Sequence, residues 1–256
     1  MYILGHMDKI VFYSEGLEQE FVQHILPAIT IDTVYSRRRL VEALVDEPYL
    51  VGAIIDIAHL SPDWITFLNA VAASFSVLPV MVALQEDHQG CPEQFLCVNR
   101  NGSDTEVSEA LKKHFGNIEK RNRRRYHRFS WPLTARVVDG DGTVHRVTEI
   151  SAGGAYLEPS SSAVGTGDTC ELEIEFRNFR MTTTCTILDP RRVGSHYGPG
   201  FGVRFDTISD PARDFVNRVV SDALIQTLTN PESSAAVPSI ETEEDVLAIG
   251  DEFSLA

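Results

Sequence analysis

Short hydrophobic runs alternate with amphipathic stretches over residues 8–115. Runs rich in β-branched residues predict strands at 9–14, 29–36, 50–58, 78–84 and 94–99, and the intervening stretches predict helices at 16–26, 37–47, 62–74 and 104–115. The run at 50–58 is nearly all apolar, as expected of a central strand buried on both faces. Strands that alternate with helices imply right-handed crossovers. This half is therefore predicted to be a doubly wound α/β domain with a five-stranded parallel sheet.

Beyond residue 130 the pattern changes to short alternating runs. They predict strands at 131–140, 141–151, 155–159, 170–176, 180–189 and 200–206. The turn signal DGDG (139–142) favours a tight hairpin between the first two, because glycine tolerates positive φ. Six short strands at this spacing predict a small antiparallel barrel, whose closure removes exposed sheet edges. One apolar stripe along 212–228 predicts a helix that closes the domain.

With 256 residues, the chain has room for two ordinary domains. The predicted organisation is an α/β domain at 7–117, a basic linker at 118–130, a β-barrel domain at 131–229 and an acidic tail at 230–256. The tail holds seven acidic residues and no basic ones, which predicts disorder. Its hydrophobic residues alternate with acids, a pattern that suits docking in a partner's groove or covering a basic patch.

Charge is unevenly distributed along the chain. The 22 basic and 37 acidic residues give a net charge of −15, which argues against a protein that coats nucleic acid, because neutralising phosphates needs an excess of Lys and Arg. Five arginines nevertheless gather in RNRRRYHR (121–128), which contains no acid. A nucleic-acid role for this segment is disfavoured because the regions on both sides are acidic. Taken alone, such a run is usually a solvated linker.

The cysteines and the lengths of the apolar runs indicate the cellular compartment of the protein. No segment approaches the roughly 18–20 apolar residues that span a bilayer, and the N-terminus lacks the features of a signal peptide. The four cysteines (Cys91, Cys97, Cys170 and Cys185) form no CxxC and lie near no histidine at zinc-ligand spacing, so neither a metal nor a disulfide framework is predicted. Cys170 and Cys185 fall in apolar strand-like runs and are expected to be buried thiols. These features predict a cytoplasmic protein without membrane insertion.

No pattern in the chain points to catalysis. The eight histidines form no HxH or HExxH motif, and no Ser-His-Asp arrangement, P-loop or carboxylate pair is present. The chain is therefore predicted not to be an enzyme and to need no cofactor.

The first domain resembles the receiver domain of bacterial response regulators, which has a flavodoxin-like fold. Asp56, near the end of the third predicted strand, matches the aspartate that accepts a phosphoryl group in that family. The first strand, however, ends in Tyr13-Ser14-Glu15 where the family has an acidic pair for Mg²⁺, and the fifth is followed by Arg100 where the family has a lysine. A degenerate, receiver-shaped contact domain is therefore favoured over phosphorylation of Asp56.

The second domain resembles the PilZ family of bacterial cyclic di-GMP receptors. Arg124 and Arg128 form an RxxxR motif just before the first predicted barrel strand. Twenty-one residues after Arg128 the sequence Glu149-Ile150-Ser151-Ala152-Gly153-Gly154 stands where the family has [D/N]xSxxG. The resemblance covers about residues 121–228.

This resemblance implies a ligand and a role for each motif residue. Cyclic di-GMP carries two phosphates and two guanines and is often bound as a stacked pair of molecules. Arginine can grip a phosphate bidentately, pair with guanine O6 and N7, or stack on the base. Arg124 and Arg128 are thereby assigned to the ligand, with Arg125 as a helper. Ser151 would offer its hydroxyl, while Gly153 and Gly154 would let the backbone approach closely.

Glu149 departs from the family's Asp or Asn. It keeps the acceptor oxygens that would meet a guanine edge but adds one methylene. Because hydrogen bonding between buried polar groups depends on geometry, the longer side chain either weakens ligand binding or is accommodated by a shift in position.

The sequence therefore favours a cytoplasmic cyclic di-GMP receptor that changes its interdomain arrangement and signals to a protein partner of unknown identity. The resemblance to the PilZ family, and not the sequence itself, suggests a role in motility or biofilm control. One alternative is a ligand-independent scaffold in which both domains serve protein contacts. Another is a phosphorylated regulator acting through Asp56. A further hypothesis is that the acidic tail competes with the ligand for residues 121–128.

Overall fold

The computed structural model describes residues 8–47, 50–75, 78–84, 90–115, 126–138, 142–158, 167–176, 179–188, 200–230 and 253–255. Contacts divide the chain into two compact units, the first comprising residues 1–124 and 225–234 and the second comprising residues 125–224 and 235–256. The predicted domain boundaries stay a prediction.

The first unit is a parallel sheet of five strands in the order β2-β1-β3-β4-β5. Its strands are β1 (Lys9–Ser14), β2 (Thr30–Val34), β3 (Leu50–Ile57), β4 (Val80–Leu84) and β5 (Leu96–Asn99). Its helices are α1 (Gln19–Ile25), α2 (Arg37–Asp46), α3 (Pro62–Ser74) and α4 (Asp104–Phe115). This strand order is the flavodoxin-like one, so the predicted doubly wound fold is confirmed.

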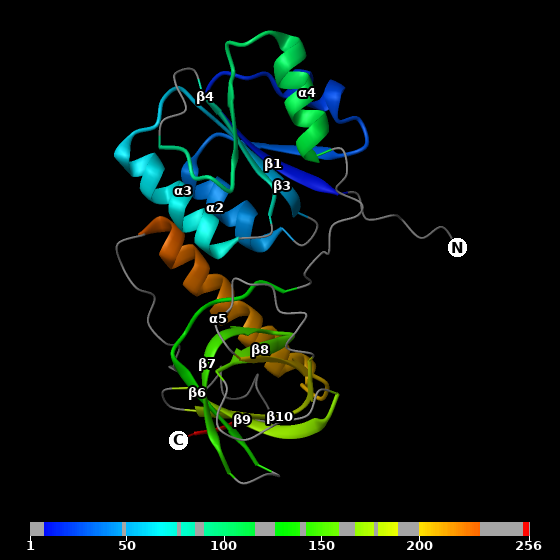
Figure 1. Ribbon diagram of the computed structural model, residues 1–256, viewed down its shortest axis with the longest axis vertical. Coiled ribbons are helices and arrows are strands. Elements are labelled where there is room, and N and C mark those ends of the chain that lie inside the picture. The colour runs from blue at the N-terminus through cyan, green and yellow to red at the C-terminus, as the bar shows by residue number, and fades with distance from the viewer. Residues whose placement is uncertain are drawn as a thin grey trace, which may run out of the picture. The chain divides into compact units, whose positions relative to one another are not determined.

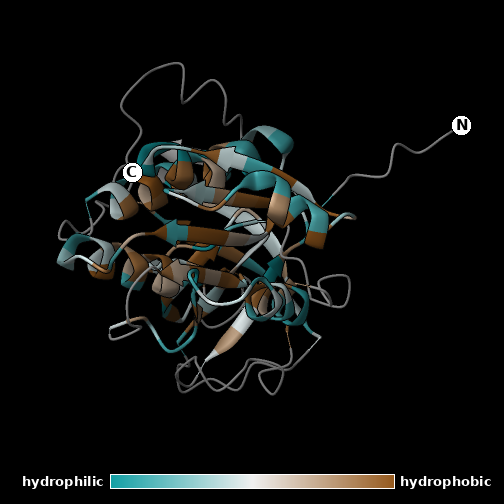
Figure 2. Ribbon diagram, turned by 90° about the horizontal axis from the view of Figure 1, so that it is seen from above, coloured by the Kyte–Doolittle hydropathy of each residue, from teal (hydrophilic) through white to brown (hydrophobic). Residues whose placement is uncertain are grey.

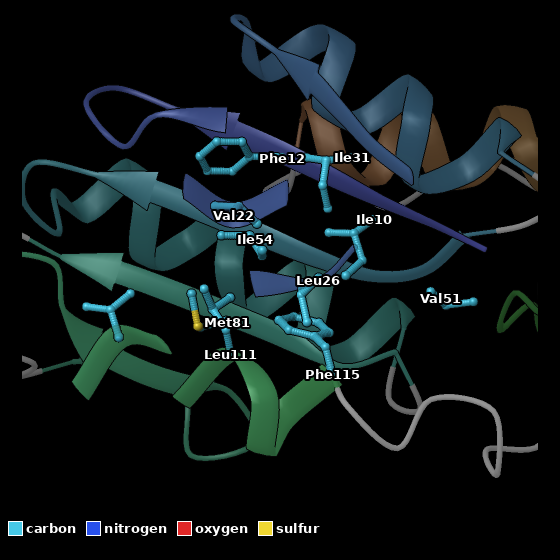
Figure 3. Packing of buried hydrophobic residues seen from close by; sticks show 11 residues of the cluster. Ile10, Phe12, Val22, Leu26, Ile31, Val51, Ile54, Met81, Leu111 and Phe115 are labelled. Carbon is cyan, nitrogen blue, oxygen red and sulfur yellow. The ribbon is translucent and has the colours of Figure 1, made fainter. Parts of the chain in front are cut away.

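Helices cover both faces of this sheet. In Figure 1, α2 and α3 lie on one face and α4 on the other, as right-handed crossovers between these strands require. Strands in the interior are mostly hydrophobic, whereas the helices alternate hydrophobic and hydrophilic sides (Figure 2). On the α4 face, Ile10, Phe12 and Ile54 pack in one cluster with Leu111 and Phe115 (Figure 3).

Gly52 shows how tightly β3 meets α4. A Cβ at this position would lie 2.5 Å from Cε1 of Phe115 and 3.1 Å from the carbonyl oxygen of Pro79. The missing side chain thus makes room for the buried Phe115 ring.

The second unit is a closed antiparallel barrel of six strands in the order β11-β8-β7-β6-β9-β10, with β10 paired back to β11. The strands are β6 (Leu133–Val137), β7 (Val144–Ser151), β8 (Gly154–Leu157), β9 (Thr169–Glu175), β10 (Phe179–Ile187) and β11 (Phe201–Phe205). Helix α5 (Asp210–Thr229) follows β11. The predicted six-stranded barrel with a C-terminal helix is confirmed.

The β6–β7 hairpin follows the predicted turn signal. Leu133 pairs with Val147 and Arg136 with Val144, and Gly142 has a φ of 71°, which only glycine adopts readily. Residues 139–141 of the turn lie outside the described residues.

A short additional strand, β12 (Phe253–Leu255), pairs with β10 at Phe179–Met181. The disorder predicted for residues 230–256 stays a prediction, and residues 231–252 and 256 lie outside the described residues. Strand β10 pairs with β11 only over Cys185–Ile187. The other end of that edge is therefore open to a further strand.

The cysteines differ in part from expectation. Cys170 and Cys185 are free, buried and directly opposite each other in the β9–β10 ladder, as predicted for inert thiols. Burial raises the pKa of the Cys185 thiol well above its ordinary value, so it stays protonated. Cys91 and Cys97 are paired as a disulfide, with Cα atoms 6.7 Å apart, a single bond that the sequence did not predict. Their spacing of six residues, across the turn that leads into β5, matches no recognised motif.

Within the described residues, no helix is long and apolar enough to cross a membrane.

The Gly52 contact yields a stability prediction. We expect Gly52→Ala to lower the free energy of unfolding by about 1–3 kcal/mol, because the new methyl group must displace Phe115 or the backbone at Pro79. Urea unfolding measures the change. The matched control is Gly202→Ala in β11, where a Cβ would make an ordinary contact 3.5 Å from Cδ1 of Leu188. Equal stability of the two variants would contradict this account of the core.

Candidate functional site

The end of the basic segment is attached to the barrel by backbone hydrogen bonds. The Phe129 N–H donates to the Ile150 carbonyl and the Ile150 N–H donates to the Phe129 carbonyl, each at 2.9 Å. This pairing lies beside the last residues of β7. It therefore places Arg128 next to the motif that begins at Glu149.

Arg128 and Glu149 form an ion pair. Nη1 of Arg128 donates to Oε2 of Glu149 at 3.2 Å, and the two side chains are 37% and 22% exposed. The structure thus brings together two residues that the sequence assigned separately to a ligand. Arg124 and Arg125 lie outside the described residues.

Ser151 is buried, and its hydroxyl forms hydrogen bonds within the loop between β7 and β8. Its hydroxyl donates to the Gly154 carbonyl at 3.1 Å and accepts from the Gly153 N–H at 3.3 Å. These two bonds close the tight connection between β7 and β8. In this structure the Ser151 hydroxyl therefore stabilises the loop. A direct role at the ligand would require the hydroxyl to point outward, which it does not do here.

Gly153 and Gly154 make close contacts with other parts of the domain. A Cβ at Gly153 would lie 2.9 Å from Cδ2 of Tyr126, and one at Gly154 would collide with the backbone carbonyl oxygen of Val203. Gly153 thus accommodates the Tyr126 ring, and Gly154 lets β8 close against β11. Both glycines thus allow close approach between parts of the protein, and their role at a ligand stays a prediction.

Arg213 was missed by the sequence analysis. This residue of α5 donates from Nη1 to the Ala152 carbonyl at 3.1 Å, and its guanidinium carbon lies 5.8 Å from the centre of the Tyr126 ring. It thereby contacts both the loop and the basic segment. No local pattern marks it, because its partners lie far away in the sequence.

Trp131 and Arg204 lie near the motif loop, since Arg204 pairs with Gly154 in the β8–β11 ladder, but their side chains contact other residues. Trp131 is 2% exposed and packs against Phe129 with ring centres 4.7 Å apart, so it belongs to the core. Arg204 lies on the exposed side of β11 and pairs with Asp206 at 2.9 Å. The pKa of Asp206 is lowered, chiefly by the hydrogen bond from the Thr186 hydroxyl and further by Arg204.

The first unit contains a different carboxylate site around Asp56. This residue is fully buried at the end of β3. Its Oδ2 accepts hydrogen bonds from three consecutive backbone N–H groups of the loop after β1, at 3.1 Å from Glu15, 2.7 Å from Gly16 and 2.8 Å from Leu17. The carboxylate thus fixes this loop.

Arg100 neutralises the same carboxylate. Its Nη1 lies 2.9 Å from Oδ1 of Asp56, and its side chain is only 14% exposed. A Cβ at Gly16 would lie 2.7 Å from this nitrogen, so the glycine leaves room for the guanidinium. The arginine that follows β5 thereby holds the acceptor oxygen that a phosphodonor would have to reach.

Glu15, the single acid in place of the family's pair, is engaged elsewhere, since its Oε2 accepts from the Ala58 N–H at 2.9 Å. Within the described part of the chain, no group of three His, Cys, Asp or Glu residues is placed to hold a metal ion.

The second unit is thus a closed six-stranded barrel with an arginine held against the end of its second strand. Residues 122–222 match the family model of the PilZ domain, and this part of the chain is a PilZ domain. A search of curated proteins found no match to the chain.

Several solved structures are similar to part of the chain. The Bacillus subtilis inhibitor of motility, MotI/DgrA, is 16% identical with a TM-score of 0.37, over 43% of this chain and 55% of that one. YcgR from Escherichia coli, solved in complex with c-di-GMP, is 16% identical with a TM-score of 0.36, over 44% and 50%. The Legionella uncharacterized protein Lpg0364 is 14% identical with a TM-score of 0.24, over 41% and 92%. The chain spans about half the length of MotI/DgrA and of YcgR.

Phosphorylation of Asp56 is the alternative that the sequence left open, and this geometry disfavours it. We expect no phosphoryl mass gain when the intact chain is incubated with acetyl phosphate and Mg²⁺, because Arg100 and three backbone amides engage both carboxylate oxygens. Intact-protein mass spectrometry measures the outcome, with a phosphorylatable receiver domain as the positive control. A mass gain that Asp56→Asn abolishes would contradict the expectation.

Proposed function

We propose that the PilZ domain of this chain binds cyclic di-GMP through the basic segment 121–128 and the loop Glu149–Gly154, and that the chain acts as a receptor and not as an enzyme. The observation that carries the proposal is the Arg128–Glu149 ion pair. It holds together, within one PilZ domain, an arginine suited to a phosphate and a carboxylate suited to a guanine edge.

The chemistry of the pair fits an exchange of partners. A guanidinium binds a phosphate with the same two-pronged geometry as a carboxylate, so Arg128 can release Glu149 for a ligand phosphate. The freed carboxylate of Glu149 then accepts hydrogen bonds from the N–H groups of a guanine. Each charged group keeps a partner throughout.

The energetics permit this exchange. A partly exposed ion pair contributes about 0–1 kcal/mol, because its groups remain partly hydrated. Opening the Arg128–Glu149 pair therefore costs little beside the charge-assisted bonds that a phosphate offers, each worth about 1.5–3 kcal/mol. The pair positions Arg128 without locking it.

The remaining motif residues act in support. Arg124 and Arg125 precede Arg128 by four and three residues and add positive charge for the second phosphate. Ser151, Gly153 and Gly154 hold the loop that presents Glu149. In this proposal, binding acts on the segment that joins the two units, and a protein partner recognises the changed surface in the cytoplasm.

The arginines supply the first test. We expect Arg124→Ala and Arg128→Ala each to weaken cyclic di-GMP binding at least tenfold, because each removes a charge-assisted contact. Fluorescence anisotropy of a labelled ligand measures affinity. Arg146→Ala is the matched control, since Arg146 lies on the same barrel in an exposed pair with Glu158 and should leave binding unchanged. Equal affinity of all three variants and the wild type would overturn the assignment.

Glu149 supplies a second test. We expect Glu149→Leu to weaken binding more than tenfold, because the guanine edge loses its acceptor. Glu149→Asp restores a family residue and should bind at least as tightly as the wild type. The same anisotropy titration compares the variants, with circular dichroism to verify the fold. Unchanged affinity in Glu149→Leu would contradict a role for this residue at the ligand.

A further inference from the structure

Tyr126 joins the basic segment to the barrel two residues before Arg128. One edge of its ring packs on Gly153, where a Cβ would lie 2.9 Å away from Cδ2. The guanidinium of Arg213 approaches the same ring, 5.8 Å from its centre and within the range of a cation–π interaction. Tyr126 therefore lies between the motif loop and helix α5.

Arg213 also holds the loop directly. Its Nη1 donates to the carbonyl oxygen of Ala152 at 3.1 Å, and Ala152 is fully buried. A guanidinium can make both contacts at once, because its N–H donors lie in its plane and leave its faces available to an aromatic ring. One side chain of α5 thus contacts both halves of the candidate site.

Arg213 lies in the first turn of α5, and that turn has a fixed start. The Arg213 N–H donates to the Ser209 carbonyl at 2.9 Å, and the Ser209 hydroxyl accepts from the Ala212 N–H at 3.3 Å. A displacement of the Arg213 guanidinium is therefore transmitted to the capped N-terminus of α5.

We propose that Arg213 is a positioning residue that couples occupation of the candidate site to the first turn of α5. The proposal rests on the proposed function, because it requires Arg128 to exchange Glu149 for a ligand phosphate. Tyr126 is only two residues from Arg128, so this exchange changes the contacts of its ring with Gly153 and Arg213. A ligand shifts a conformational equilibrium only through contacts that differ between states, and this contact is one that differs.

Hydrogen–deuterium exchange tests the coupling on the full chain. We expect cyclic di-GMP to change amide exchange in the peptide covering the start of α5 in the wild type. Arg213→Met should abolish this change and weaken binding about three- to tenfold, because it removes the cation–π contact and the bond to Ala152. The ligand-dependent exchange is a readout that a merely structural role would leave intact.

Arg218→Met is the matched control. Arg218 lies on the same helix, is exposed, and stacks on Phe215 of its own helix at 5.5 Å. This variant should keep both the affinity and the ligand-dependent exchange of the wild type. A second variant, Tyr126→Leu, should reproduce the effect of Arg213→Met, and the double variant should be no worse than either single one.

The outcomes separate the two proposals. Binding by the wild type together with unchanged ligand-dependent exchange in Arg213→Met would overturn the coupling and leave the proposed function standing. Additive losses in the double variant would also overturn it. No binding of cyclic di-GMP by the wild type would overturn the proposed function and the coupling with it.

Discussion

The mutual backbone pairing of Phe129 with Ile150 is the constraint on which the candidate site depends. It fixes the point where the basic segment meets the barrel. Because of it, Arg128 lies beside Glu149 and Tyr126 lies on Gly153, within reach of Arg213. Without this pairing, an arginine run in an acidic protein would be an ordinary solvated linker.

The Arg100–Asp56 and Arg128–Glu149 ion pairs differ in exposure, and exposure decides what each can do. Arg100 and Asp56 are 14% and 0% exposed, whereas Arg128 and Glu149 are 37% and 22% exposed. Separating buried charges costs several kcal/mol per ion, so the first pair is a fixed part of its unit. The second pair remains partly hydrated and can exchange partners at small cost. The buried pair thus fixes the loop after β1, whereas the partly exposed pair is the one that we propose to exchange partners on ligand binding.

Much of the fold could be predicted from the sequence because its signals are local. Helix α3 begins at Pro62 after the Ser61 cap, and its apolar residues recur at helical spacing, so its bounds were predicted correctly.

The site was predicted only in part. The motifs gave Arg128 and Glu149, but the contact of Arg213 with Ala152 joins residues 61 apart, which no periodicity reveals. The hydrogen bonds of the Ser151 hydroxyl to Gly153 and Gly154 likewise depend on the conformation of the loop between β7 and β8.

The central claim is that this PilZ domain binds cyclic di-GMP through exchangeable charged groups. Isothermal titration calorimetry of the intact chain with cyclic di-GMP, at low and at high salt, tests it most directly. We predict saturable binding that weakens as the salt concentration rises, because phosphates replace a partly hydrated carboxylate at Arg128. Absence of binding heat at both salt concentrations, with no shift in melting temperature on adding the ligand, would contradict the account.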